Sequence, residues 1–314
     1  MTRDTDITTR SVAFEKYHGT DNDFVVVDAD EYVPDRGAFA TTYCDRSEGV
    51  SPASVVGREA GAVASEGGIE GPVGADGVLF LALEDAFSPP RVVMTLVQPD
   101  GSTAAMCGNG ARCAAAWASN RTGSEEIMID TQSGTRHARV EGGEATIEMG
   151  VPAFAPSEVP LAAGRTAPLI EENVEGLTVT AVDTGVPHAV AFVEDVDAVD
   201  LDSVAPAVRY ADVFPEGTNV TVAEQIEGER AFRQRTYERG VEGETQSCGT
   251  GAVAVAAVAK RLGRLAGDDP VTVSPPGGDL TITVPDDGPA TLQGPVVRDF
   301  SGELAADPRR RVDA

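Results

Sequence analysis

The sequence predicts an α/β protein, of the α+β kind, built from two similar domains that each wrap β-strands around one central helix. The first observation is a repeated motif, Cys107-Gly-Asn-Gly-Ala-Arg and Cys248-Gly-Thr-Gly-Ala-Val, whose cysteines lie 248 − 107 = 141 residues apart. The second is that each motif runs directly into an alanine-rich apolar segment. A helix that is apolar nearly all round must be buried on every side, and surrounding strands would bury it.

The first half of the chain is expected to contain many short strands. Runs of β-branched and aromatic residues bounded by turn-forming residues predict strands at 12–17, 24–28, 78–83, 91–97, 127–131, 136–141 and 145–149. The Pro-Asp-Gly sequence predicts a turn at 98–102. The alanine-rich segment after Cys107 predicts a helix that stops between Asn120 and Gly123.

The second half repeats this plan. Strands are predicted at 177–183, 189–194, 219–222, 231–238, 271–274, 280–284 and 291–300. A helix is predicted over 251–265, directly after Cys248. The loop-rich stretch from Pro152 to Pro168 is interpreted as the boundary between the two domains.

The chain is strongly acidic, with 51 Asp+Glu against 24 Lys+Arg and a net charge of −27. Such a charge repels phosphates and anionic lipids, so neither nucleic acid nor a membrane is expected as a partner. The acidic, lysine-poor and alanine-rich composition indicates a halophile-like surface that stays hydrated in concentrated salt. The start of the chain lacks an apolar signal region, and the longest apolar run, 252–259, is too short to span a membrane. We expect a cytoplasmic protein.

Four cysteines are too few and too scattered for a disulfide scaffold, and none forms a C-x-x-C pair. With three histidines in the chain, a cysteine–histidine metal site is not expected either. Cys44 and Cys113 lack a motif and are interpreted as buried core residues.

Cys107 and Cys248 are the candidate reagents. Each is expected at a helix N-terminus, where free N–H groups and the helix dipole favour a thiolate. The bare backbone at Gly108-Asn109 and Gly249-Thr250 would cradle a carboxylate. If one sulfur removes a proton from a carbon and the other returns one to the opposite face, the pair racemises or epimerises that carbon. The helix N-termini would stabilise the developing charge without pyridoxal phosphate.

Several segments resemble, in order, the diaminopimelate epimerases, which are cofactor-independent epimerases of a lysine-biosynthesis intermediate. The matching segments are HGTDNDFVVVD (18–28), CDR (44–46), GADGVL (74–79), PDGSTAAMCGNGARC (99–113), GVPHAV (185–190), TNV (218–220), YERGVEGETQSCGTGAVA (237–254) and GPVVRDF (294–300). They span nearly the whole chain, and the two cysteine motifs are highly specific.

The resemblance implies two pseudo-symmetric domains, each a β-barrel-like shell around a central helix, with the active site in the cleft between them. The N-terminal domain would comprise residues 1–151 and a returning strand near 291–302. The C-terminal domain would comprise residues 152–290, and residues 303–314 would form a tail.

The resemblance also implies roles for individual residues. Cys107 and Cys248 match the paired acid and base, while His188 and Glu238 match residues that tune the thiols. Substrate-binding groups are implied at Asn22, Gln98, Gly108, Asn109, Asn219, Glu238, Arg239, Gly249 and Thr250. The implied reaction converts LL-diaminopimelate to meso-diaminopimelate without metal or cofactor. Which cysteine begins as the thiolate is left open.

Three departures from the family pattern bear on the substrate. Gln98 and Val186 stand where the family commonly has asparagines that hold the unreactive end of the substrate. Losing one hydrogen bond to a charged ligand costs about 1.5–3 kcal/mol. The third departure is an insertion of 27 residues, 47–73, which would form a lid, a dimer contact or neither. A homodimer is left open.

Two alternative functions follow from these departures and from the thiols. The first is a racemase or isomerase that uses the same cysteines on another amino acid or small carboxylate. The second, more remote, is a non-enzymatic redox-sensing or ligand-binding protein whose two thiols form a disulfide.

Overall fold

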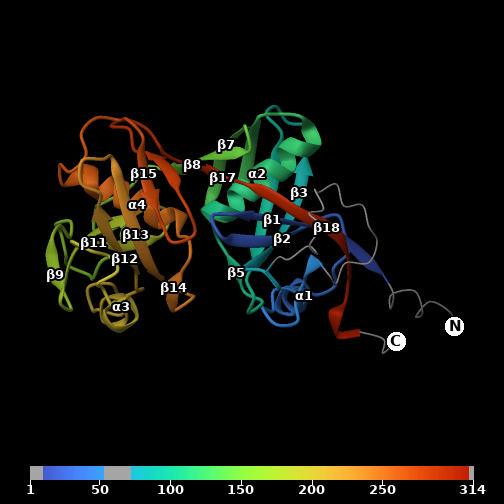
Figure 1. The fold of residues 1–314 in the computed structure, drawn as a ribbon, viewed down its shortest axis with the longest axis horizontal. Helices are drawn as coiled ribbons and strands as arrows, with labels where there is room; N and C mark the ends of the chain where they lie inside the picture. The colour runs from blue at the N-terminus through green and yellow to red at the C-terminus, as the bar shows by residue number, and fades with distance from the viewer. Residues whose placement is uncertain (1–9, 53–71, 311–314) are drawn as a thin grey trace. The chain divides into compact units, whose positions relative to one another are not determined.

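The computed structural model describes residues 10–52 and 72–310 and divides into two compact units. Unit 1 takes in the described residues up to Ala145 and those from Val296 onward, and unit 2 is Thr146–Pro295 (Figure 1). Of the insertion predicted at 47–73, residues 53–71 lie outside the described residues, as does the end of the predicted tail, 311–314.

Within its described residues, unit 1 contains two helices, α1 (Arg36–Tyr43) and α2 (Gly108–Thr122), and a short 3₁₀ turn at Pro308–Arg310. Its strands are β1 (Ser11–Gly19), β2 (Asn22–Asp28), β3 (Gly77–Glu84), β4 (Arg91–Val97), β5 (Thr103–Ala104), β6 (Glu126–Thr131), β7 (Gly134–Glu141) and β18 (Val297–Ala305). Strand β8 (Glu144–Gly150) crosses from unit 1 into unit 2. Strand β1 pairs antiparallel with both β2 and β18.

Unit 2 also contains two helices, α3 (Leu201–Arg209) and α4 (Gly249–Arg261). Its strands are β9 (Glu172–Val174), β10 (Leu177–Asp183), β11 (Pro187–Phe192), β12 (Asn219–Gln225), β13 (Ala231–Glu238), β14 (Gly243–Thr245), β15 (Val271–Ser274), β16 (Leu280–Thr283) and β17 (Ala290–Pro295).

The two units repeat one pattern of strand pairing. In unit 1, β1–β2 is antiparallel, β2–β3 parallel, β3–β4 antiparallel and β4–β6 parallel. In unit 2, β10–β11, β11–β12, β12–β13 and β13–β15 show the same alternation. Helices α1 and α3 lie in the first parallel crossover of each unit, and α2 and α4 lie in the second. The duplication predicted from the cysteine motifs is therefore present in the fold.

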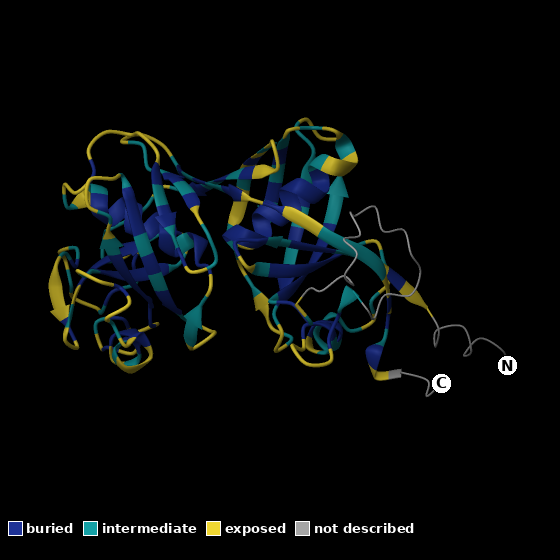
Figure 2. Cartoon of the chain, viewed as in Figure 1, coloured by how far each residue is buried: buried dark blue, intermediate teal, exposed yellow. Residues whose placement is uncertain are grey.

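Helices α2 and α4 are the buried centres of their units, as Figure 2 shows by their dark colour. Helix α2 contacts β1, β2, β3, β4, β6 and β7, and α4 contacts the corresponding strands of unit 2. Alanine, glycine and valine make up most of α4, and alanine is the commonest residue of α2; such small side chains let strands approach from every side. Helix α2 stops at Gly123, which takes the left-handed conformation typical of a C-cap (φ 71°).

Helices α1 and α3, which the sequence analysis did not predict, pack against the other face of the strands. In unit 2, Leu201, Ala205 and Val208 of α3 join a hydrophobic cluster with Val220 and Val222 of β12. In unit 1, Phe39, Ala40 and Tyr43 of α1 join a cluster with residues of β1, β2 and β3. In the strands that join these clusters, alternate residues therefore face either the central helix or the outer helix.

Several predicted boundaries were wrong. Helix α4 ends at Arg261 rather than Leu265, because the chain turns at Gly263 with φ 72°. The single strand predicted at 291–300 is two strands, β17 and β18, separated at Val296. Strand β18 also continues to Ala305.

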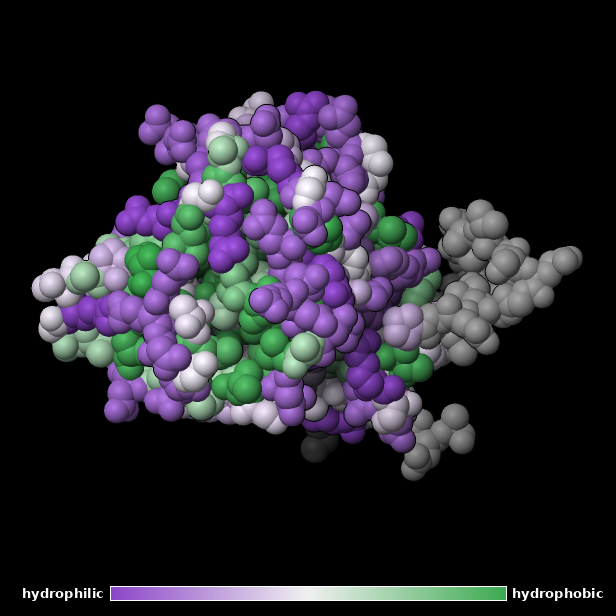
Figure 3. Space-filling view, turned by 60° about the vertical axis from the view of Figure 1, so that its left-hand side comes forward, coloured by the Kyte–Doolittle hydropathy of each residue, from purple (hydrophilic) through white to green (hydrophobic). Residues whose placement is uncertain are grey.

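Hydrophilic residues cover much of the face drawn in Figure 3, with smaller hydrophobic areas between them. Among the helices that the structure describes, none combines the length and the hydropathy that a membrane span requires.

Candidate active site

Cys107 lies directly before α2 and caps its N-terminus. Its backbone is extended (φ −146°, ψ 120°), and its Sγ accepts a hydrogen bond from the Gly110 amide at 3.4 Å. The thiol donates to Asn22 Oδ1 at 3.8 Å, and Asn109 Nδ2 donates to the same oxygen at 3.2 Å. Three residues predicted from the sequence, Cys107, Asn22 and Asn109, therefore form one cluster, called here the Cys107 site.

Asp76 orients the side chain of Asn22. Asn22 Nδ2 donates to Asp76 Oδ2 at 2.6 Å, and the Asp23 amide donates to the same oxygen at 3.0 Å. Because a carboxylate oxygen accepts hydrogen bonds, the amide nitrogen of Asn22 faces Asp76 and its oxygen faces Cys107. Asp76 was not among the residues predicted from the sequence.

Arg112 orients the side chain of Asn109 in the same way. It is fully buried in α2, and its Nη2 donates to Asn109 Oδ1 at 2.6 Å and to Thr20 Oγ1 at 2.9 Å. Burial lowers the pKa of the Arg112 guanidinium. Since the Asn109 oxygen accepts from Arg112, its NH2 group is directed to Asn22.

A charge network, with Lys16 and Asp23 buried and Arg46 about half exposed, supports the turn that carries Asn22. Lys16 Nζ donates to Asp23 Oδ2 at 2.6 Å, and Arg46 donates to both oxygens of Asp23 at 2.8 and 3.2 Å. Arg46 also pairs with Asp76. Burial alone would raise the pKa of the Asp23 carboxyl, but hydrogen bonds from Arg46 and the charge of Lys16 hold that pKa below its usual value.

Cys248 lies directly before α4, in the position that Cys107 has before α2. Its backbone is again extended (φ −116°, ψ 100°), and its Sγ lies 3.5 Å from Thr250 Oγ1. Burial raises the pKa of the Cys248 thiol well above its usual value, and the charge of Glu238 raises it further. The donors at the start of α4, Thr250 and Gly251, lower the pKa of Cys248, in the direction expected for a helix N-terminus, but burial outweighs them.

His188 reaches Cys248 through Thr250. Its Nε2 lies 3.0 Å from Thr250 Oγ1 and its Nδ1 lies 3.2 Å from Thr221 Oγ1. Burial lowers the pKa of His188 to about 3, with a smaller contribution from the charge of Arg239. The imidazole is therefore neutral near pH 7, and one ring nitrogen carries hydrogen. Cys248, Thr250, His188 and Glu238 are called here the Cys248 site.

Asn219 and Arg239 form a second polar group in unit 2. The Arg239 amide donates to Asn219 Oδ1 at 2.8 Å, and Asn219 Nδ2 donates to the Pro187 carbonyl at 2.9 Å. Arg239 Nη1 donates to the carbonyls of Glu216 and Gly217 at 3.2 and 3.3 Å. These bonds hold the Arg239 side chain beside the N-terminal end of β12.

Gln98 and Val186, the two departures from the family pattern, lie in turns. Gln98 Oε1 accepts from Ser102 Oγ at 2.8 Å, within the turn predicted at 98–102. The Val186 carbonyl accepts from the Thr184 amide at 3.2 Å, and Thr184 Oγ1 donates to the Thr250 carbonyl at 3.0 Å. The turn containing Val186 is therefore bonded to the first residues of α4.

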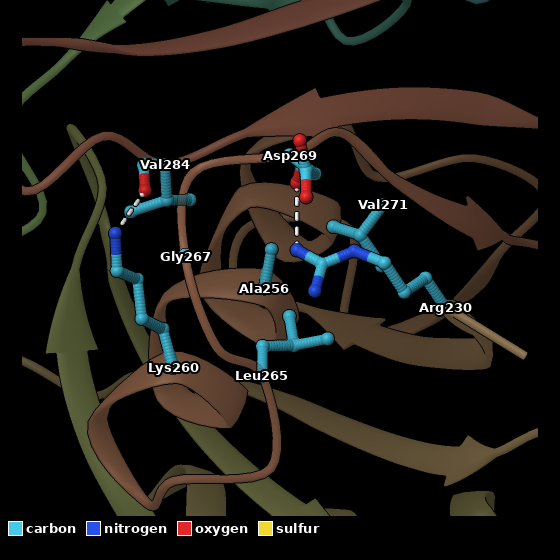
Figure 4. Close-up of a pocket in the computed structure, with 8 residues that line it drawn as sticks. All are labelled: Arg230, Ala256, Lys260, Leu265, Gly267, Asp269, Val271 and Val284. Carbon is cyan, nitrogen blue, oxygen red and sulfur yellow. Dashed lines mark hydrogen bonds between the residues drawn. The ribbon is translucent and has the colours of Figure 1, made fainter.

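A small pocket lies at the far end of α4 from Cys248 (Figure 4). Its cations are already bonded: Lys260 donates to the Val284 carbonyl at 2.7 Å and Arg230 donates to the Asp269 carbonyl at 2.7 Å. Its lining therefore offers no unbonded cation to a ligand. Over residues 10–52 and 72–310, no cluster of three or more His, Cys, Asp or Glu side chains is arranged to hold a metal ion.

The sequence profile described as diaminopimelate epimerase matches residues 69–155 and 180–298, more than half of the chain. The diaminopimelate epimerase of Methanocella arvoryzae is 42% identical over 306 residues, which cover 94% of this chain and 98% of that protein. The chain belongs to the diaminopimelate epimerase family. The diaminopimelate epimerase of Methanothrix thermoacetophila is 39% identical over 294 residues, covering 90% of this chain and 92% of that protein.

Solved structures share the fold of this member of the diaminopimelate epimerase family. A phenazine biosynthesis protein of the PhzF family from Bacillus anthracis matches with a TM-score of 0.63 and 14% identity, covering 94% of this chain and 99% of that one. A hydroxyproline epimerase from Agrobacterium vitis matches with a TM-score of 0.58 and 18% identity, covering 95% and 93%. At these identities the likeness concerns the two-domain α+β fold alone.

Several residues that contact the predicted ones were not themselves predicted from the sequence. Asp76 and Arg112 lie inside segments that carried the family resemblance, so that resemblance was a signal for both. Thr221 interrupts the run of valines in β12, and a polar residue within a buried strand was the available signal there.

Proposed function

We propose that this chain epimerises LL-diaminopimelate to meso-diaminopimelate. The family profile and relatives of 39–42% identity that carry this name support the proposal. The observation that carries it is structural: each unit has one cysteine at the N-cap of its central helix, followed by Gly-polar-Gly.

In the proposed mechanism, the two sulfurs act on opposite faces of one α-carbon. One cysteine, as thiolate, takes the α-hydrogen as a proton and leaves the bonding electron pair on the α-carbon. The other cysteine, as thiol, gives its proton to the opposite face and becomes the thiolate, so atoms and charge balance. The raised pKa of Cys248 supports its role as the proton donor at the start of one direction of reaction.

The residues next to each cysteine would stabilise the substrate carboxylate. Gly108 and Asn109 lie in the first turn of α2, and Gly249 and Thr250 lie in the first turn of α4, so their N–H groups point toward the N-terminal ends of these helices. Such groups bind anions, and they would stabilise the charge that grows as the α-proton leaves. Asn22 adds a polar group beside Cys107.

Arg239 and Asn219 are the proposed binding groups for the unreactive end of the substrate. A guanidinium binds a carboxylate with two parallel N–H donors, and diaminopimelate carries a second carboxylate at that end. Gln98 remains a candidate for this end, since its amide can still donate and accept hydrogen bonds. The Val186 side chain can neither donate nor accept a hydrogen bond, so the groups around Arg239 would determine the selectivity for the substrate.

Proton NMR in D2O tests the proposed reaction and its mechanism together. Reduced protein should exchange one α-hydrogen of LL- or meso-diaminopimelate and interconvert the two isomers. Cys107→Ala and Cys248→Ala should each abolish interconversion, while Cys44→Ala, a buried cysteine in the outer cluster of unit 1, should keep it. Exchange with other amino acids but not with diaminopimelate would instead support the alternative racemase. Full activity in either active-site variant would refute the two-sulfur mechanism.

The remaining expectations extend the same proposal. The enzyme would act in the cytoplasm on a small-molecule substrate, without nucleic acid or membrane, and its charge of −27 supports this. It would also work without metal or cofactor. Activity should therefore survive extensive treatment with a metal chelator, and the active protein should show no pyridoxal absorbance. Sedimentation analysis would decide whether it is a homodimer.

A further inference from the structure

We propose that Gln234, Thr236 and Thr221 are positioning residues that hold His188 in the tautomer with hydrogen on Nε2. In that tautomer the hydroxyl of Thr250 donates its hydrogen bond to the sulfur of Cys248. The inference rests on the proposed function for its catalytic meaning, because it assigns a hydrogen-bond donor to one of the two proposed reacting sulfurs. The hydrogen-bond geometry that it rests on is independent of the reaction.

The direction of the hydrogen-bond chain is set at Gln234, which is buried in β13. Gln234 Nε2 lies 2.9 Å from the carbonyl oxygen of Cys248 and 3.4 Å from Thr236 Oγ1. A backbone carbonyl only accepts hydrogen bonds, so the atom of Gln234 that faces it must be the NH2 group. The second hydrogen of that group is directed to Thr236.

Two buried threonines carry this direction to His188. Within the described residues, Thr236 Oγ1 has two hydrogen-bonding neighbours, Gln234 Nε2 and Thr221 Oγ1, the latter at 3.1 Å. Because Gln234 donates to Thr236, the Thr236 hydrogen can only be used by donating to Thr221. Thr221 then donates its own hydrogen to His188 Nδ1, 3.2 Å away. The reverse direction would leave the buried hydrogen of Thr236 facing the NH2 group of Gln234.

His188 passes the direction on to the sulfur. Since the neutral ring accepts at Nδ1, its one hydrogen lies on Nε2, which donates to Thr250 Oγ1 at 3.0 Å. Thr250 Oγ1 therefore accepts from His188 and directs its own hydrogen to Cys248 Sγ, 3.5 Å away. This chain of hydrogen bonds begins at the carbonyl of Cys248 and ends at the sulfur of the same residue.

Gly251 gives a second, independent sign that these groups are built to converge. A Cβ placed on Gly251 would lie 3.0 Å from Gln234 Nε2, 3.1 Å from Thr236 Oγ1 and 3.2 Å from Cys248 Sγ. The absence of a side chain at Gly251 allows the Gln234 amide and the Cys248 sulfur, which lie near the two ends of the hydrogen-bond chain, to pack together at the first turn of α4. Any larger residue would push at least one of the three groups away.

The chain of hydrogen bonds stabilises the deprotonated form of Cys248. Glu238 opposes the effect of Thr250, because its charge and its hydrogen bond to Cys248 favour the protonated sulfur. When Cys248 gives up its proton, the thiolate needs a donor in a buried place, and Thr250 supplies one without any rearrangement. Arg239 is the charged group that acts on His188, and together with burial it helps to keep the ring neutral.

Long-range ¹H–¹⁵N NMR of the imidazole rings tests the inference directly, because it distinguishes the two neutral tautomers. The chain has three histidines, so His188→Asn assigns the signal by its loss. Wild-type protein should show hydrogen on Nε2 of His188. Thr221→Val should abolish that preference and give a mixture of tautomers, and Thr221→Ser should restore it. Thr180→Val, which removes a buried hydroxyl of β10 that bonds to the Glu171 amide, should leave the tautomer unchanged.

Kinetics on the same variants connect the tautomer to the reaction. An equal mixture of tautomers leaves about half of the molecules with a hydrogen-bond donor to the charged sulfur, so the exchange rate should be about 2-fold lower in Thr221→Val and should recover in Thr221→Ser. Hydrogen on Nδ1 in wild-type protein, or an unchanged tautomer in Thr221→Val, would overturn the inference whatever the activity. A protein with the Nε2–H tautomer that does not act on diaminopimelate would instead refute the proposed function and leave the hydrogen-bond chain intact.

Discussion

The first prediction concerns Lys16, which lies in the charge network of unit 1. Its side chain is 1% exposed and Asp23 is 7% exposed, with 2.6 Å between Nζ and Oδ2. Lys16 also donates to the Gly74 carbonyl. Lys16→Met keeps an unbranched side chain of similar length but removes the charge and both hydrogen bonds.

The expected loss of stability follows from what remains after the substitution. Removing one member of a buried ion pair costs about 3–5 kcal/mol. Arg46 still pairs with Asp23, so the lower end, about 3 kcal/mol, applies. With a denaturant dependence of about 1–3 kcal/mol/M, the urea midpoint of unit 1 should fall by roughly 1–3 M.

Urea unfolding followed by tryptophan fluorescence measures this change in the correct unit, because the single tryptophan, Trp117, is buried in α2. Lys260→Met, followed by circular dichroism, is the matched control, since the chain has two lysines. Lys260 pairs with Asp268 and Asp286, whose side chains are 50% and 77% exposed. In Lys260→Met water solvates these two carboxylates, so the loss of stability should be much smaller than in Lys16→Met. Equal shifts in the two variants would refute the reasoning that burial makes the Lys16 pair strong.

Three further predictions follow from other features of the structure. Because the folded-state pKa of Asp23 is depressed, its contribution to stability is complete above its unfolded pKa of about 3.9 and is lost as pH falls through the folded value. Lys16→Met should therefore unfold in acid at a higher pH than the wild-type protein, as followed by Trp117 fluorescence. An unchanged midpoint pH would count against this role of the Lys16–Asp23 pair. Gly251→Ala should lower the free energy of unfolding by about 1 kcal/mol, because crowding of the new Cβ at 3.0–3.2 Å outweighs the gain in helix propensity. Gly243→Ala is the control: its Cβ would have no heavy atom within 4 Å, so its free energy of unfolding in urea should be unchanged. Equal changes in the two variants would contradict the crowding at Gly251. Potassium chloride should raise the melting temperature by about 5 °C or more, since it screens the repulsion of a −27 charge; calorimetry showing no salt dependence would rule out the halophile-like surface.

The central helices were predictable because their sequences are unusual, while the outer helices were not. The Cys-Gly-polar-Gly motifs mark the starts of α2 and α4, and Gly123 marks the end of α2. Helix α1 has eight residues and α3 has nine with Pro206 inside, so neither shows a long apolar period. Their N-caps, Asp35 and Asp200, were the available signals.

At the candidate site, the sequence identified groups but not their surroundings. Three residues that the sequence selected singly, Asn22, Asn109 and Cys107, are hydrogen-bonded to one another, and all three lie in short motifs with specific spacing. The protonation of Cys248 depends on its burial, which no local motif encodes. The contact between Thr221 and Thr236 depends on the register of β12 against β13, which pairs these two residues directly.

The return of β18 to β1 sets the order in which the protein can be completed during synthesis. Unit 2 is one continuous segment, Thr146–Pro295, so all of its strands have been made before β18 is translated. Unit 1 begins the chain, but β1 pairs with β18 along almost its whole length, from Ser11–Ala305 to His18–Val297. Until the ribosome has made the last strand, one edge of β1 lacks its partner. The N-terminal unit, although translated first, is therefore the last to close.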